Sequence, residues 1–124
     1  LLGVLAQRLV RKICDQCREP EPDPLKVFER LHIEPPKNGL IQLWRGGGCA
    51  LCKDTGYKGR QGVFELMVIT DDFHDAIVNR RGAPEFYRLA CQNGMKTMFE
   101  DGVQRALKGI TTLEEVLKVT RLQA

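Results

Sequence analysis

The sequence of 124 residues lacks any apolar run long enough to cross a bilayer. Its opening apolar stretch, residues 1–5, is too short and wrongly flanked for a secretory signal peptide. The cysteines number five, and an odd count fits a reducing compartment better than a secreted disulfide scaffold. These absences predict a cytoplasmic protein. An initiating methionine is also missing, so we expect a segment excised from a longer protein.

A phosphate-binding loop of the form G-x-x-x-x-G-K-[ST] is absent as well. A glycine run at 46–48 precedes Cys49, but no Lys-Ser or Lys-Thr pair follows it. Close backbone approach around a metal site accounts better for this run, because glycine has no Cβ. We therefore do not expect the chain to hydrolyse a nucleoside triphosphate by itself.

Two cysteine pairs are the strongest motif that the sequence contains. They have the form C-x-x-C, and 31 residues separate them. Each pair holds two sulfurs on a tight turn, and two such turns can supply four thiolates to one tetrahedral Zn²⁺. Two disulfides, a redox dithiol and four unrelated buried cysteines are the alternatives. We predict a closed structural zinc site, without catalytic residues, whose ligands are Cys14, Cys17, Cys49 and Cys52.

Three further residues have simpler expected roles. Cys91 has no C-x-x-C partner and is predicted to be a buried thiol. Trp44 is expected to pack in the core beside the second cysteine pair, and His32 to lie at the surface or at a cap.

Charge and aromatic content bear on nucleic-acid binding. The formal charge is +3, and four thiolates with one Zn²⁺ would change it by −4 and +2, which leaves +1. Only Trp44 and Tyr57 supply aromatic side chains near the basic residues, and this corrected charge is small, whereas nucleic-acid-binding modules usually show a strongly basic face. A zinc-ribbon-type module that binds nucleic acid or protein is therefore the alternative interpretation. Several basic residues lie near the cysteine pairs in the sequence. They either offset the negative charge of the thiolates or form a surface that binds phosphates or an acidic partner. They are Arg8, Arg11, Lys12, Arg18, Lys53, Lys58 and Arg60.

Proline, glycine and capping residues predict several short helices. Asp23 and Pro24 begin a helix that ends near residue 32 and fills the loop between the cysteine pairs. Helix-like spacing covers 2–9, and strands are predicted at 10–13, 40–44 and 62–69, the last of them substantially buried. Four helical patterns follow, at 71–82, 84–94, 97–109 and from 112 onward. The predicted fold class is α+β, with a small zinc-stabilised module (zinc-ribbon-like knuckles plus one helix) joined to a strand and a cap of four short helices.

Several separated motifs then match one family in order. They are AQRLVR at 6–11 before the first cysteine pair, TGYKGRQGVFEL at 55–66 after the second, GMKT at 94–97, EDG at 100–102 and GITTLEEV at 109–116. In these residues the chain resembles the secretion traffic ATPases, the motors of type II secretion and type IV pilus assembly.

The resemblance implies a hexameric ATPase that is cytoplasmic and peripheral at the inner membrane. ATP and Mg²⁺ would belong only to the full-length parent, and residues 1–13 would be the tail of its nucleotide-binding core. Residues 14–57 would form the tetracysteine zinc module, and 58–124 the C-terminal strand and helical subdomain. The implied partners are the ATPase core, neighbouring subunits, and an inner-membrane platform or adaptor protein, with nucleic acid disfavoured. Arg8 and Arg60 are the candidates to reach nucleotide or a neighbouring subunit.

Overall fold

A computed structural model describes residues 3–37, 39, 41–68, 82–92 and 94–120. It has the mixed α/β character predicted, with small sheets, short helices and a cluster of four cysteines. The elements run in the order β1 (Gly3–Ile13), β2 (Arg18–Pro20), α1 (Pro24–Arg30), β3 (Trp44–Gly46), β4 (Tyr57–Val68), α3 (Ala83–Gln92), α4 (Met98–Leu107) and α5 (Leu113–Thr120).

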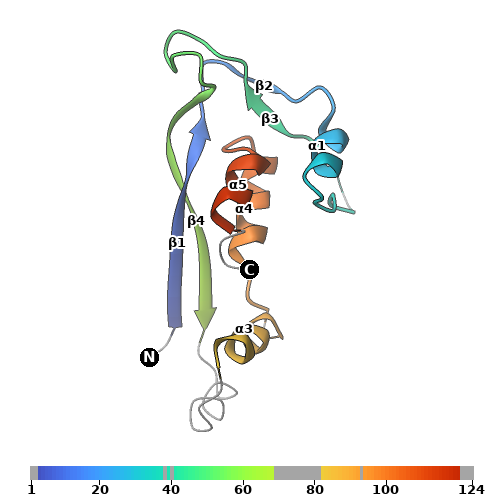
Figure 1. Ribbon diagram of the computed structural model, residues 1–124, viewed down its shortest axis with the longest axis vertical. Coiled ribbons are helices and arrows are strands. Elements are labelled where there is room, and N and C mark those ends of the chain that lie inside the picture. The colour runs from blue at the N-terminus through green and yellow to red at the C-terminus, as the bar shows by residue number, and fades with distance from the viewer. Residues whose placement is uncertain (1–2, 38, 40, 69–81, 93, 121–124) are drawn as a thin grey trace.

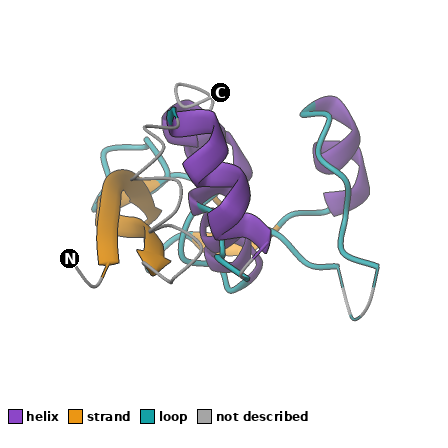
Figure 2. Ribbon diagram, turned by 90° about the horizontal axis from the view of Figure 1, so that it is seen from below, coloured by secondary structure: helices purple, strands orange, loops and turns teal. Residues whose placement is uncertain are grey.

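A long antiparallel ribbon of β1 and β4 forms one side of the molecule (Figure 1). Figure 2 places this ribbon on one side of the central helices and α1 on the other. The helix expected over 2–9 is wrong, because β1 already begins at Gly3 and pairs with β4 up to Val68. Leu5 and Leu9 lie four residues apart, a spacing that fits one face of a strand as well as one face of a helix.

The strand predicted at 62–69 is confirmed in type over its described residues but not in burial. Val63 is buried and packs with Val10 of β1 and Met98 of α4. Leu66 and Val68, on the opposite face of the same strand, are more than half exposed. The ribbon therefore buries one face against the helices and leaves much of the other open.

The helix predicted between the cysteine pairs is confirmed as α1. The Asp23 side chain accepts a hydrogen bond from the Lys26 N–H, and Pro24 occupies the first turn. Phe28 and Val27 then enter the larger core together with Leu113 of α5. This core thus joins α1, from the loop between the cysteine pairs, to the C-terminal helices.

Three of the four predicted C-terminal helices fall in the described part of the chain and are confirmed as α3, α4 and α5. The Thr97 hydroxyl accepts from the Glu100 N–H at 3.1 Å, and Thr112 accepts from the Glu115 N–H at 3.3 Å. The helix expected at 71–82 lies almost wholly outside the described residues. Among the described residues of the strand predicted at 40–44, only Trp44 is in a strand, at the start of β3. No helix in the described residues combines the length and apolarity that a bilayer crossing requires.

Candidate metal centre

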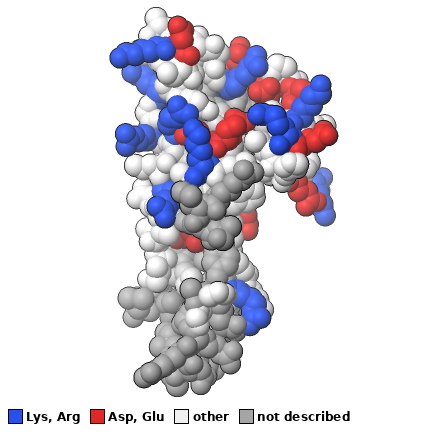
Figure 3. Space-filling view, in the orientation of Figure 1, with Lys and Arg blue, Asp and Glu red and all other residues white. Residues whose placement is uncertain are grey.

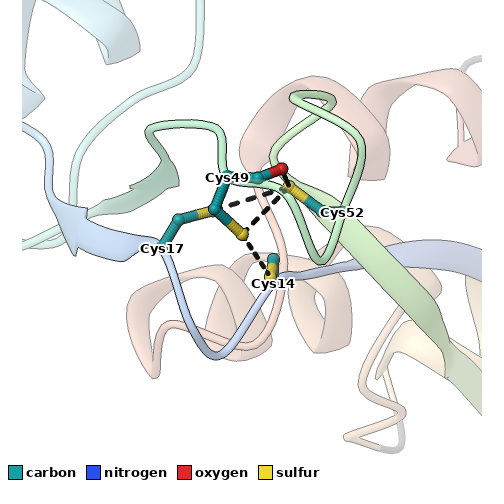
Figure 4. Close-up of side chains that lie close together, drawn as sticks. All are labelled: Cys14, Cys17, Cys49 and Cys52. Carbon is teal, nitrogen blue, oxygen red and sulfur yellow. Dashed lines mark hydrogen bonds between the residues drawn. The ribbon is translucent and has the colours of Figure 1, made fainter.

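Two tight turns place the four predicted cysteines together. Cys14 and Cys17 lie in the turn between β1 and β2, and Cys49 and Cys52 precede β4. In Figure 4 the four side chains converge from these two turns. All four Sγ atoms lie within 4.8 Å of one another.

The sulfur spacing fits a tetrahedral tetrathiolate. The Sγ atoms of Cys14 and Cys49 and those of Cys17 and Cys52 are 3.7 Å apart, and those of Cys49 and Cys52 are 3.6 Å apart. Four sulfurs at about 2.3 Å from one Zn²⁺ would lie about 3.8 Å from each other. A disulfide needs about 2.05 Å, so this arrangement suits a shared ion and not two S–S bonds.

The glycine run at 46–48 is explained in part by close contact between its backbone and that of Gly56. A Cβ on Gly46 would lie 2.1 Å from the carbonyl oxygen of Gly56, so neither backbone leaves room for a side chain there. Gly56 also has a φ of +82°, and its N–H donates to Cys52 Sγ at 3.3 Å. The expectation of close backbone approach beside the site is confirmed.

The thiols differ in how readily they ionise. Burial disfavours the Cys52 thiolate, but hydrogen bonds from the Gly56 N–H and the neighbouring sulfurs outweigh it and lower the pKa to about 6. Burial, together with the surrounding sulfurs, raises the pKa of Cys17 to about 12. A metal that binds all four sulfurs must displace the protons they carry, so its affinity would increase with pH.

The two predicted arginines lie on the ribbon outside the sulfur cluster. Arg8 is exposed on β1 opposite Val63, and Arg60 is exposed on β4 directly opposite Arg11. Neither forms an ion pair with another described residue. Arg60 lines a shallow hollow of about 300 Å³ with Tyr57. On the face of the molecule that Figure 3 shows, the charged side chains along the ribbon are mostly Lys and Arg, whereas charges of both signs surround α1.

The remaining expectations have mixed outcomes. His32 is exposed just after α1, as predicted, with a φ of +57°. Trp44 is half-buried and its ring lies against Gly109. The expectation of a buried Cys91 is wrong, because this thiol is exposed on α3.

Sequence reasoning missed a buried carboxylate that ties α5 to β1. Glu115 is 4% exposed; its Oε1 accepts from the Arg11 N–H at 2.8 Å, and its Oε2 accepts from the Arg11 guanidinium at 3.0 Å. The capping pattern at 112–115 marked Glu115 as a helix-start residue. No local signal identifies Arg11 as its partner, because the two residues lie 104 positions apart in the sequence.

Comparison with known proteins gives matches over nearly the whole chain. The family model described as "Type II/IV secretion system protein" matches residues 1–118. The chain is 47% identical over 121 residues to the type IV pilus assembly ATPase PilB of Thermus thermophilus, with 97% of this chain and 14% of that protein covered. It is 44% identical over 121 residues to type II secretion system protein E of Aeromonas hydrophila, with coverage of 98% and 24%.

A third relative is the type II secretion system ATPase E of Vibrio cholerae, 38% identical over 126 residues, with 98% of this chain and 24% of that protein covered. The chain thus spans between about a seventh and a quarter of the length of these relatives.

Proposed function

This chain belongs to the family of type II/IV secretion system proteins, and we propose that it is the C-terminal part of an ATPase motor that powers type II secretion or type IV pilus assembly. The relatives named as ATPases support the proposal, since each matches almost the whole chain. The motor would be hexameric, cytoplasmic and peripheral at the inner membrane. ATP and Mg²⁺ would bind to the larger part of the parent protein, where a phosphate-binding loop is expected.

The four cysteines would hold one structural Zn²⁺ in this motor. The observation that supports this most is the sulfur spacing of 3.6–3.7 Å, which matches a closed tetrahedral shell. When bound, zinc would supply folding free energy, about 10–16 kcal/mol in small zinc modules near neutral pH. That is comparable to the typical net stability of a whole domain, about 5–15 kcal/mol, so metal binding would contribute much of the stability of the two turns.

The proposed organisation of the chain is the one that the family resemblance implies. Residues 1–13 would be the tail of the nucleotide-binding core, 14–57 the zinc module, and 58–124 the C-terminal strand and helices. Arg8 and Arg60 would reach nucleotide or a neighbouring subunit of the hexamer. This role is supported by their exposure and by the lack of an ion-pair partner for either among the described residues.

The zinc module would be the contact surface for the membrane platform or an adaptor protein. Two leucines on it are half exposed or more: Leu51, in the second cysteine turn, and Leu25, on α1. Large contiguous apolar patches mark interaction sites, whereas single exposed leucines are common on any protein surface. These two leucines are therefore the positions at which the proposed contact can be tested.

Substitution of Leu51 in the full-length parent tests this function. We expect Leu51→Asp to keep its zinc but to bind the inner-membrane platform protein about tenfold more weakly, a loss of about 1.4 kcal/mol, and thereby to reduce secretion or pilus assembly. Leu51→Met is the matched control, because it keeps an apolar side chain at the same place. Undiminished platform binding by a zinc-loaded Leu51→Asp protein would reject the contact. Tight, steeply salt-dependent binding to DNA or RNA would favour the nucleic-acid alternative instead.

A further inference from the structure

One short segment near the C-terminus contacts the chain on both sides of the first cysteine turn. We call residues 108–112 the α4–α5 corner. The Ile13 N–H, immediately before Cys14, donates to the carbonyl oxygen of Ile110 at 2.9 Å. The Arg18 guanidinium, immediately after Cys17, donates to the carbonyl oxygen of Gly109 at 3.3 Å. Both ends of the first turn are therefore bound to the corner.

The same corner contacts the chain on both sides of the second turn. Trp44, in β3, lies so close to Gly109 that a Cβ there would be 2.9 Å from its ring. The Tyr57 hydroxyl, at the start of β4, forms a hydrogen bond of 2.8 Å with the Thr112 hydroxyl. All four segments that lead into or out of the cysteine turns thus meet these five residues.

Glu115, one turn further along α5, reinforces this attachment. Besides both bonds to Arg11, its carboxylate pairs with Lys118 at 3.0 Å. The Arg11 carbonyl accepts from the Thr111 hydroxyl at 2.8 Å. The Arg11 guanidinium also lies over the Tyr57 ring, 4.1 Å from its centroid. One buried carboxylate therefore orients β1 three residues before Cys14 and, through Arg11, the start of β4.

We propose that the α4–α5 corner and Glu115 preorganise the four cysteines, so that metal binding and the docking of α5 are thermodynamically coupled. Glu115 is then a positioning residue for the metal, acting through Arg11. If the turns are already held together, the metal meets a smaller entropic cost of ordering them. The coupling is reciprocal, so metal binding must also strengthen the docking of α5. This inference rests on the proposed metal site.

The test compares two single substitutions in the whole 124-residue chain. Glu115→Gln keeps the shape of the side chain but removes its charge. Glu114→Gln is the matched control, since Glu114 is the neighbouring residue and, among the described residues, pairs only with Arg30, at the surface. Zinc affinity is measured by competition with a chromogenic chelator, and folding of each apo protein is checked by circular dichroism. Loss of a group that hydrogen-bonds directly to a metal ligand typically costs about 10–100-fold in metal affinity. Glu115 acts one contact further out, through Arg11, so we expect a loss of about tenfold or less for Glu115→Gln and none for Glu114→Gln.

A second measurement reports on α5 directly. Amide hydrogen exchange of the wild-type chain, with and without zinc, should show slower exchange in α5 when metal is bound, and Glu115→Gln should reduce that difference. A merely structural role would shift the unfolding midpoint but would not make exchange in α5 respond to metal. If Glu115→Gln does not fold, Tyr57→Phe replaces it; this variant removes the bond to Thr112 and should weaken zinc binding several-fold.

The outcomes separate the two proposals. A wild-type chain that takes up no metal contradicts the zinc site, and the coupling with it. A wild-type chain that binds zinc tightly, with unchanged affinity in the folded variants and no metal effect on exchange in α5, overturns only the coupling.

Discussion

Two carboxylates attach the C-terminal helices to the edges of the ribbon. Glu115 holds the β1 edge, and Asp101 of α4 holds the β4 edge. Asp101 Oδ2 accepts from the Phe64 N–H at 2.9 Å and from Arg105 Nε at 3.0 Å. Burial would raise the pKa of Asp101, but these bonds and the charge of Lys96 outweigh it and leave the pKa below its ordinary value. For Glu115, burial is outweighed in the same way by Arg11 and Lys118.

Substitution of Asp101 should therefore change the acid sensitivity of the fold. A lowered pKa in the folded state means that the ionised carboxylate stabilises the fold above its ordinary pKa, and that this contribution is lost as the pH falls through the lowered value. We expect Asp101→Asn to reduce the free energy of unfolding at neutral pH by about 1.5–3 kcal/mol and to flatten its decline in acid. Urea unfolding at a series of pH values, from neutral to below the ordinary pKa of an aspartate, measures both the free energy of unfolding and its decline in acid. Glu29→Gln, on the exposed side of α1, is the control, and a decline in Asp101→Asn as steep as in wild type would contradict the account.

The elements differ in how far the sequence determines them. The α1, α4 and α5 starts could be predicted, because Asp23, Thr97 and Thr112 bond to nearby N–H groups in the same helix. The first half of β1 could not be predicted, because the spacing of Leu5 and Leu9 fits the repeat of a helix as well as that of a strand. This strand is determined by its pairing with β4, which lies far away in the sequence. The cysteine cluster could be predicted because each turn is encoded within four residues. The Glu115 attachment depends on a contact across the chain and leaves no local pattern.

The packing of α1 on the C-terminal helices predicts a strong effect of Phe28. This side chain is 1% exposed and lies in the core with Leu113 and Ala106. We expect Phe28→Ala to lower the free energy of unfolding by about 3–5 kcal/mol. Leu25→Ala, on the same helix but more than half exposed, should stay within about 0.5 kcal/mol. Denaturant unfolding followed by circular dichroism measures the free energy of unfolding of both variants. A similarly small decrease in both would show that this core contributes little to stability.

At the scale of the whole molecule, the cysteine turns lie where the ribbon, the β2–β3 pair and the C-terminal helices meet. Figure 1 shows these parts converging at the upper end of the ribbon, with α3 at the other end. A closed tetrathiolate there would have no catalytic role, and its loss would affect every element attached to it. In the proposed motor the site would fasten a module for partner contact to the part of the chain that joins the ATPase core.

The structural zinc site is tested by the zinc content of the purified chain, measured together with alkylation of its thiols under native conditions. We expect one Zn²⁺ per chain, with four cysteines protected and only the exposed Cys91 reactive. A chelator should release the ion and make all five thiols reactive, and Cys49→Ser with Cys52→Ser should abolish binding, whereas Cys91→Ser should leave it unchanged. A chain without metal whose four clustered cysteines react as readily as Cys91, or are joined in disulfides, would contradict the central claim.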